Sequence, residues 1–456
     1  MGKKFDFQYI VIGSGPAGSA AATMLAKAKK NVALIEDRFF GGTDTNSLNV
    51  PFLAALDFAH TFNKLSSFPE LKNQDISFNF PTIVAREQKA IANTSGNNRQ
   101  TLEQTGVFCY GGHATLLDAH TISVKDKQFS TTNFILATGS HLKTTEIAGL
   151  NTTSYLTPET ALRLRRCPSV IAVVGAGSTG CEIASFYAEL GAKVILFETA
   201  NRILPHEDVE ASAAISNYFT HKLDVNIQTS SKATAIGEDE YSKYVIFRYG
   251  TAEKMVRVKQ IALATGSLPN LDYGLDKAKV KCKNSGIQVN KLFETSAKNI
   301  YAIGDCIGGE SSTERAYQQG ITLATNLIKK TKTPASYRGT TRITNTYLQV
   351  ATVDMNEEDL MRRDRKYKKA VISFNDITAG KISGPSYGFV KLLADHSNKI
   401  IGATIVGPEA GYIGQEISFA IRHQQSAVEL ASTPHLINSY NQAVKLAAKQ
   451  LLLKKH

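Results

Sequence analysis

Short apolar runs alternate with a helix-forming stretch near the start of the chain. An apolar run at Tyr9–Ile12 is followed by helix-forming residues at Ala20–Lys29 and by a second apolar run at Val32–Ile35. The same order returns between Ser169 and Glu198. A strand, a helix and a second strand in this order predict a βαβ unit with parallel strands. We therefore expect two such units in the chain.

In each unit the turn between the first strand and the helix carries three glycines spaced G-x-G-x-x-G, and the second strand ends on a glutamate. The first glycine permits a tight turn, the second lets a pyrophosphate approach, and the third lets the helix pack against the strand. The helix N-terminus attracts phosphate, and the glutamate can bind ribose hydroxyls. We predict two dinucleotide sites, formed by Gly13, Gly15, Gly18 and Glu36 and by Gly175, Gly177, Gly180 and Glu198.

The second site favours NAD over NADP. A carboxylate at the end of the second strand suits a free 2′-hydroxyl better than a 2′-phosphate, and Glu198 occupies that position. Arg202 lies four residues further on and could reach a 2′-phosphate, which keeps NADP as the alternative.

Three other segments add to this pattern. The sequence "ILATGS" at Ile135–Ser140 is echoed by "ALATGS" at Ala262–Ser267, and "KNIYAIGDCIGG" at Lys298–Gly309 predicts a strand followed by Asp305. A carboxylate there cannot neutralise a pyrophosphate, but it can accept hydrogen bonds from the ribityl hydroxyls of a flavin. Near the C-terminus, the apolar run at Ile400–Gly407 predicts a further strand.

Composition narrows the class of protein. The 456 residues carry a net charge of +12, but no nucleic-acid motif accompanies it, so we expect a solvated basic face and no nucleic-acid partner. The five cysteines form no C-x-x-C pair, which argues for a reducing compartment and against a metal site. The sequence contains no apolar run long enough to span a membrane and no signal peptide. We expect a cytoplasmic protein.

Taken together and in this order, the motifs resemble the FAD-dependent pyridine nucleotide–disulfide oxidoreductases. The branch that looks most similar contains dihydrolipoamide dehydrogenase, glutathione reductase and mercuric reductase. The resemblance implies an α/β fold with two Rossmann-like dinucleotide-binding domains and a C-terminal α+β dimerisation domain, and it implies a homodimer. The implied boundaries are an FAD-binding domain at 1–148 and 270–335, an NAD(P)-binding domain at 149–269 and a dimerisation domain at 336–456.

The resemblance also implies the cofactors. FAD is expected at the first glycine motif and NAD at the second, with NADH preferred over NADPH. It adds further cofactor-binding residues from the matching motifs. They are Gly42, Thr43, Ala114, Thr138, Gly139 and Asp305 for FAD, and Gly266 for the nicotinamide dinucleotide.

The chain departs from the family where disulfide chemistry takes place. Members that reduce disulfides read G-G-T-C-x4-C-x-P-S-K, whereas this chain has Asp44 and Asn49 at the two cysteine positions and Leu53 at the lysine. The family glutamate that pairs with this lysine remains as Glu182, which we expect to lack a partner. The C-terminal H-P-x4-E pattern is also lost, and His435 lies two residues late. Candidate catalytic residues are therefore Asp44, Asn49, Glu182 and His435.

These losses lead to our principal functional hypothesis. Thiol–disulfide exchange needs a thiolate that attacks a sulfur, and neither Asp44 nor Asn49 provides one. We expect an oxidoreductase that passes hydride from NADH to FAD and then directly to a quinone, dioxygen, a nicotinamide dinucleotide or a carrier protein. Mercury reduction is rejected because mercury needs soft thiolate ligands.

Two alternatives stay open. The first is a non-catalytic flavin-binding scaffold or redox sensor derived from the disulfide reductase fold. The second is a disulfide reductase that uses Cys181 and Cys306 as a displaced pair.

Overall fold

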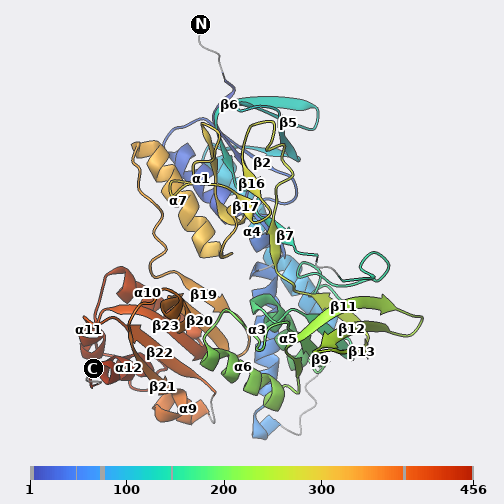
Figure 1. The fold of residues 1–456 in the computed structure, drawn as a ribbon, viewed down its shortest axis with the longest axis vertical. Coiled ribbons are helices and arrows are strands. Elements are labelled where there is room, and N and C mark those ends of the chain that lie inside the picture. Colours follow the sequence, from blue (N-terminus) through green and yellow to red (C-terminus); the bar gives the residue numbers. More distant parts are fainter. Residues whose placement is uncertain (1–4, 48, 72–77, 145–146, 384–386, 454–456) are drawn as a thin grey trace. The chain divides into compact units, whose positions relative to one another are not determined.

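The computed structural model describes residues 5–453 except 48, 72–77, 145–146 and 384–386. Its chain divides into two compact units (Figure 1). The first contains residues 1–54, 85–143 and 266–337, and the second contains residues 55–84, 144–265 and 338–456. Neither unit is a continuous stretch of chain, because each is assembled from segments that lie far apart in the sequence.

The first unit is built on a seven-stranded sheet in the order β3-β2-β1-β6-β5-β4, with β18 paired to β6. Strands β1, β2, β3, β6 and β18 pair in parallel, whereas β4, β5 and the first residues of β6 form an antiparallel meander. The strands are β1 (Phe7–Ile12), β2 (Val32–Glu36), β3 (Phe108–Gly111), β4 (Ala114–Leu116), β5 (Thr121–Val124), β6 (Lys127–Leu136) and β18 (Ile300–Ala302).

Two helices of the first unit, α1 (Pro16–Lys27) and α7 (Thr313–Lys329), lie side by side (Figure 1). Their close approach depends on Gly320, where a Cβ atom would overlap the carbonyl oxygen of Ala17. The remaining elements here are α2 (Gly42–Ser47), β7 (Ser140–Leu142), β15 (Ser267–Pro269), β16 (Cys282–Lys283), β17 (Gly286–Ile287) and the 3₁₀ helix η2 (Gly304–Ile307). Two long helices, α3 (Asn49–Ser66) and α4 (Phe80–Gln104), each begin in one unit and end in the other.

The second unit contains a four-stranded parallel sheet in the order β10-β9-β8-β14 and a three-stranded antiparallel sheet, β11-β12-β13. Helix α5 packs on β8 and β9, so the second βαβ unit forms as the sequence predicts. The elements are β8 (Val170–Val174), α5 (Ser178–Glu189), β9 (Lys193–Phe197), α6 (Val209–Lys222), β10 (Asn226–Gln228), β11 (Ser231–Glu238), β12 (Lys243–Tyr249), β13 (Ala252–Val258), β14 (Gln260–Leu263) and η1 (Pro69–Leu71).

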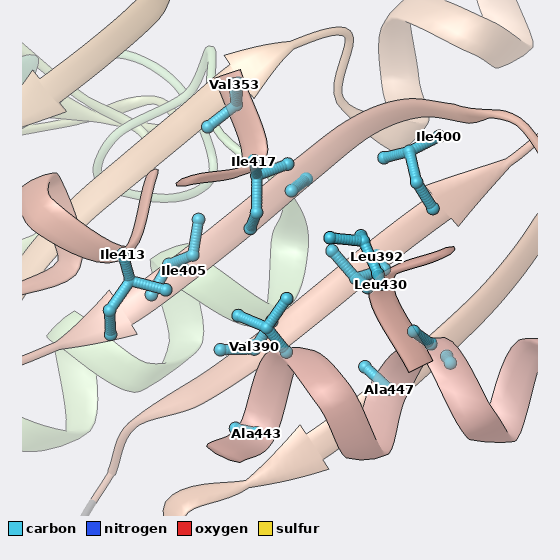
Figure 2. Close-up of a cluster of buried hydrophobic side chains, with 14 of the residues drawn as sticks. Val353, Val390, Leu392, Ile400, Ile405, Ile413, Ile417, Leu430, Ala443 and Ala447 are labelled. Carbon is cyan, nitrogen blue, oxygen red and sulfur yellow. The ribbon is translucent and has the colours of Figure 1, made fainter. Parts of the chain in front are cut away.

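The C-terminal part of the second unit is a five-stranded antiparallel sheet in the order β19-β20-β23-β22-β21. Figure 2 shows Ile413 and Ile417 of α10 and Ala443 and Ala447 of α12 in the apolar core that covers this sheet. The elements are β19 (Thr341–Thr344), β20 (Gln349–Asp354), α8 (Glu357–Arg362), β21 (Lys368–Ser373), η3 (Phe374–Asp376), α9 (Thr378–Ser383), β22 (Phe389–Ala394), β23 (Ile400–Gly407), α10 (Ala410–Arg422), α11 (Ala427–Ser432) and α12 (Gln442–Leu453).

A fully buried lysine joins the two parts of the second unit. The Nζ of Lys391 on β22 lies 2.8 Å from a carboxylate oxygen of Asp208, 2.8 Å from one of Glu210 and 2.9 Å from one of Glu357. Asp208 and Glu210 belong to the start of α6, whereas Glu357 begins α8. The ammonium group is therefore compensated by carboxylates from both parts.

The predicted strands are found where the apolar runs lie, at β1, β2 and β23. The first helix begins at Pro16, four residues before the predicted start at Ala20, because proline is well suited to the first turn of a helix. None of the helices in the described ranges is long and apolar enough to cross a membrane. The domain boundaries stay a prediction.

Candidate active site

The first glycine loop lies between β1 and α1 and is packed tightly at two of its three glycines. A Cβ atom on Gly13 would overlap the carbonyl oxygen of Ala137, and one on Gly18 would overlap that of Gly13. A Cβ atom on Gly15 would meet nothing within 4 Å, and Gly15 is the N-cap of α1 without a side-chain cap. The loop therefore leaves room for a ligand where the helix amides point outward.

The acid at the end of β2 is fixed by this loop. One carboxylate oxygen of Glu36 accepts hydrogen bonds from the backbone N–H of Ser14 (2.8 Å) and from its hydroxyl (2.6 Å). The other accepts from the backbone N–H of Arg38 (3.0 Å). Burial raises the pKa of Glu36, and these hydrogen bonds oppose that rise. The carboxylate is thus held beside the loop, as a ribose-binding acid must be.

The segment at Gly41 and Gly42 closes over the same loop. The backbone N–H of Gly41 donates to the hydroxyl of Ser14 (2.9 Å). A Cβ atom on Gly42 would lie 2.6 Å from the Cα of Gly15. Thr43, half-buried, follows in α2. The "GGT" frame is therefore part of the first nucleotide cradle.

The other residues predicted for FAD lie in the same unit. Asp305 accepts hydrogen bonds from the hydroxyls of Ser140 (3.2 Å) and Ser311. Gly139 has a positive φ of 68°, and a Cβ atom there would meet nothing within 4 Å. Ala114 is buried in β4, and Thr138 donates its hydroxyl to the carbonyl of Asn270 (2.9 Å).

The second glycine loop repeats the first. A Cβ atom on Gly175 would overlap the carbonyl of Ala264, and one on Gly180 would overlap that of Gly175, whereas the space at Gly177 is open. The carboxylate of Glu198 accepts from the backbone N–H groups of Ala176 (2.8 Å) and Ala200 (2.9 Å). The second cradle thus fits a dinucleotide by the same criteria. Gly266, with φ of 88° and open space, lies in the first unit.

Arg202 has its own partners in the second unit. Its guanidinium forms an ion pair with Glu358 and donates to the carbonyl oxygens of Pro205 (2.9 Å) and Glu207 (3.4 Å). A cation already engaged in this way is a poorer ligand for a 2′-phosphate. The geometry therefore adds to the sequence argument for NAD.

Comparison with protein families identifies the chain. The model of the pyridine nucleotide-disulphide oxidoreductase family matches residues 7–320, and the dimerisation domain of the same family matches residues 340–448. The chain belongs to this family. The predicted fold class, with two dinucleotide-binding parts and a dimerisation domain, is confirmed.

Individual relatives cover nearly the whole chain. A dihydrolipoyl dehydrogenase from Chlorobaculum parvum is 29% identical over 457 residues, covering 97% of this chain and 96% of the relative. A mercuric reductase from Staphylococcus aureus is 27% identical and covers 97% of this chain and 82% of the relative. The crystal structure of LpdA from Mycobacterium tuberculosis superimposes with a TM-score of 0.89 at 24% identity, covering 97% of this chain and 99% of that one. This last likeness concerns the fold.

The family assignment gives the cofactors and supports an assembly. Members bind FAD and NAD(P)H, and the two cradles of this oxidoreductase fit two dinucleotides. The match at residues 340–448 supports a homodimer.

Two candidate catalytic positions lie in the first unit. The side chain of Asp44, in α2, is outside the described part of the structure. Asn49 begins α3, and its exposed side-chain amide donates to the hydroxyl of Thr313 (3.0 Å). The Asn49 amide thus has a polar partner from the start of α7, and it carries no titratable proton.

Glu182 lies in the second unit, and the expectation that it lacks a partner is wrong. One of its carboxylate oxygens accepts hydrogen bonds from the backbone N–H of Asn345 (2.7 Å) and from the side-chain amide of the same residue (3.1 Å). Burial raises its pKa to about 7, although both hydrogen bonds oppose the rise. An asparagine therefore holds the Glu182 carboxyl.

His435 also has partners of its own in the second unit. Its Nδ1 lies 2.8 Å from the carbonyl oxygen of Thr433, and its Nε2 lies 2.7 Å from a carboxylate oxygen of Glu416. Asn441 donates to the other oxygen of Glu416 (2.6 Å). His435 and Glu182 share no hydrogen-bond partner among these contacts. Each of these two candidate residues is therefore oriented by its own set of hydrogen bonds.

All five cysteines are free thiols. Cys181 and Cys306 are buried, and burial raises the pKa of both thiols, that of Cys306 to about 11. The thiol of Cys181 donates to the carbonyl of Ala176, and that of Cys306 to the carbonyl of Ile303. Neutral, hydrogen-bonded thiols are poor nucleophiles.

Sequence reasoning missed several residues that shape the cradles. Ser14 occupies a variable position of the glycine motif, and Asn270 donates from its side chain to the carbonyl of Thr138 (2.8 Å). Asn345 lies 163 positions after Glu182. Of these three residues, only Asn270 had a signal in the sequence, because it ends the motif "ATGSLPN".

Proposed function

We propose that this chain is an FAD-dependent NADH oxidoreductase that delivers electrons from its flavin directly to an acceptor, without a redox-active disulfide. The observation that supports the proposal is that a chain with two cradles fitting dinucleotides has five cysteines that are all free thiols. The two positions of the family's cysteine pair hold Asp44 and Asn49. Candidate acceptors are a quinone, dioxygen, a second nicotinamide dinucleotide or a carrier protein.

Bound FAD would supply the two-electron chemistry, and the protein would supply binding, orientation and protons. Gly15 and the amides at the start of α1 form the pyrophosphate cradle, while Glu36 offers a carboxylate to the ribose. The carboxylate of Asp305 would accept hydrogen bonds from hydroxyl groups of FAD, because it already accepts hydrogen bonds from two serine hydroxyls. The residues of the first cradle thus fit FAD.

The second cradle supports a preference for NADH. Glu198 is held by loop amides at the position that accepts the ribose hydroxyls, and Arg202 is engaged by Glu358. Glu182 lies in α5, and because burial raises its pKa to about 7 it would hold or release a proton near neutral pH.

Rapid mixing tests the proposal. We expect NADH to bleach the flavin absorbance of the purified holoenzyme, and a panel of acceptors to restore it. A variant with all five cysteines changed to serine should keep both phases. Turnover that disappears in C181S or C306S would show a displaced disulfide, and a flavin that NADH leaves oxidised would show a scaffold or sensor.

A further inference from the structure

A chain of hydrogen bonds in the second unit leads from Glu182 to a buried ion pair. It begins with Asn345, in the turn between β19 and β20, whose backbone and side-chain N–H groups both donate to Glu182. The carbonyl oxygen of Asn345 in turn lies 3.1 Å from Nε2 of His60 on α3. Asn345 is therefore the link between the Glu182 carboxyl and the His60 ring.

Both ring nitrogens of His60 face acceptors. Nδ1 lies 2.7 Å from a carboxylate oxygen of Glu189, whose side chain is fully buried, and Nε2 faces the Asn345 carbonyl. Two acceptors require two N–H donors, which only the imidazolium form provides. Burial would lower the pKa of His60, but the hydrogen bond and charge of Glu189 outweigh it, so the pKa is raised. His60 thus carries a positive charge close to Glu182.

The ion pair is anchored on its other side too. The second carboxylate oxygen of Glu189 accepts from the hydroxyl of Ser185, and that hydroxyl accepts from the backbone N–H of Tyr347 (3.4 Å). The turn at residues 345–347 is therefore attached to α5 at two points, through Glu182 and through Ser185. His60 supports the same turn from α3.

Aromatic side chains cover this cluster. The ring of Tyr347 stands edge-on to His60 with centroids 5.8 Å apart and stacks on Tyr218 of α6 at 5.6 Å. Asn63, one turn after His60, donates to the hydroxyl of Tyr218 (2.9 Å). The titratable groups that face the cluster include Asp57 and His60 on α3, Cys181, Glu182 and Glu189 on α5, Tyr218 on α6, and Tyr347 and Tyr387.

We propose that His60 is a positioning residue for Glu182. Its imidazolium, paired with Glu189, clamps the carbonyl of Asn345, and this fixes the two N–H groups that orient the Glu182 carboxyl. His60 also stabilises the ionised carboxyl through its charge. The inference deepens the proposed function, because it assigns the control of Glu182 at the nicotinamide-binding cradle to residues outside the glycine motif.

The first experiment measures the titration of the Glu182 carboxyl by ¹³C NMR in the holoenzyme without added nucleotide, with E182Q used to assign the resonance. In H60Q the carboxyl loses a nearby positive charge, so its midpoint should rise by about half a unit to one unit. In N345A it loses one N–H donor and should rise by about half a unit. The matched control is H120Q, since His120 is also hydrogen-bonded to a carbonyl, that of Thr131, but lies in the first unit.

An unchanged or lowered midpoint in folded H60Q, or in N345A, would overturn the proposal. The second readout is the pH dependence of the NAD⁺ dissociation constant by calorimetry, whose inflection should move with the carboxyl midpoint. An inflection that stays at its wild-type pH also contradicts the proposal. If the wild-type protein binds no NAD⁺, the proposed function fails, while the carboxyl titration still tests the positioning role.

Discussion

The two glycine loops share one backbone design but have different surroundings. In each loop the third glycine lets the helix backbone touch the first glycine. The residue after the third glycine then donates a side-chain hydrogen bond to a backbone carbonyl of the loop. Ser19 donates its hydroxyl to the carbonyl of Ser14 (2.6 Å), and Cys181 donates its thiol to the carbonyl of Ala176 (3.4 Å). The repeated contacts are those that shape the turn, so they do not distinguish one dinucleotide from the other.

The difference lies in what covers each loop. In the first, the Ser14 hydroxyl joins Glu36 to Gly41, and Gly42 packs against Gly15. In the second, Ala176 replaces the serine, and the following segment is attached through the backbone N–H of Leu204 (2.8 Å). We therefore expect the first loop, which has more contacts with its covering segment, to release its cofactor more slowly than the second loop releases its nucleotide.

A second difference lies one turn into the helix. The position of Glu182 in α5 corresponds by motif alignment to Ala20 in α1, and both side chains are buried. Only the second module therefore places a titratable group at this position beside its loop. A single helix position is thus enough to add a proton-carrying group to a nucleotide cradle.

The largest effect is expected where the two loops agree. In Gly18→Ala and Gly180→Ala the new Cβ atom would overlap a backbone carbonyl, so each should reduce the free energy of unfolding by on the order of 4 kcal/mol. G18A should lose FAD on gel filtration, whereas G180A should keep FAD and lose NADH binding. Denaturant unfolding and nucleotide titration measure both.

The open glycines provide the matched control. Gly15→Ala and Gly177→Ala should change the free energy of unfolding by less than about 1 kcal/mol, because a Cβ atom there meets no protein atom. They should weaken FAD and NADH binding respectively by at least about tenfold, since the methyl group stands where the pyrophosphate approaches. Unchanged affinity in either variant would contradict the assignment of that loop.

The next effect follows from Glu182. Its pKa of about 7 in the folded protein lies above the ordinary value of 4.5, so between these pH values the folded protein keeps a proton that the unfolded chain has released. The wild-type protein should therefore lose stability as pH rises through this window, by on the order of 3 kcal/mol. Glu182→Gln should remove this loss, as measured by denaturant unfolding at pH 5 and pH 8. Equal pH dependence in E182Q and the wild type would refute the raised pKa.

A smaller effect tests the cover of the first loop. Ser14→Ala makes that loop resemble the second, because the backbone N–H of Gly41 loses its acceptor and Glu36 loses a donor. We expect a loss of about 1–2 kcal/mol and faster release of FAD, followed by flavin fluorescence. Equal FAD release from S14A and the wild type would argue against the role of the cover.

The smallest effect concerns nicotinamide specificity. Glu358→Gln would leave the Arg202 guanidinium without its ion-pair partner, and this pair is partly exposed, with side chains 25% and 37% accessible. We expect the affinity for NADP⁺ relative to NAD⁺ to rise by about twofold to fivefold, measured by calorimetry. A ratio that does not change would show that Arg202 has no part in the choice.

Local sequence signals predicted the parts of the molecule that depend on local geometry. The glycine loops, the strands that flank them and Glu36 and Glu198 follow from spacing and apolar patterning alone. The partners of Glu182 and Arg202 could not be predicted in this way. Asn345 lies 163 positions from Glu182, and Glu358 lies 156 positions from Arg202. Such contacts are fixed by the packing of whole elements, which periodicity does not describe.

The same limit explains the wrong expectation for Glu182. The resemblance implies that Leu53 stands at the family's lysine position, but it cannot show that a distant asparagine supplies two donors to Glu182. Ser14 was missed for a different reason, since a variable position in a glycine motif gives no indication that its side chain joins two other segments.

The buried Lys391 has a consequence for dissecting the protein. A fragment that contains only the C-terminal sheet would keep this ammonium and Glu357 but lack the two carboxylates of α6. Leaving a buried charge without part of its compensating charge is unfavourable by several kcal/mol. The dimerisation region should therefore melt together with the second nucleotide module in a single transition, and expressing it in isolation should give an insoluble or unfolded product.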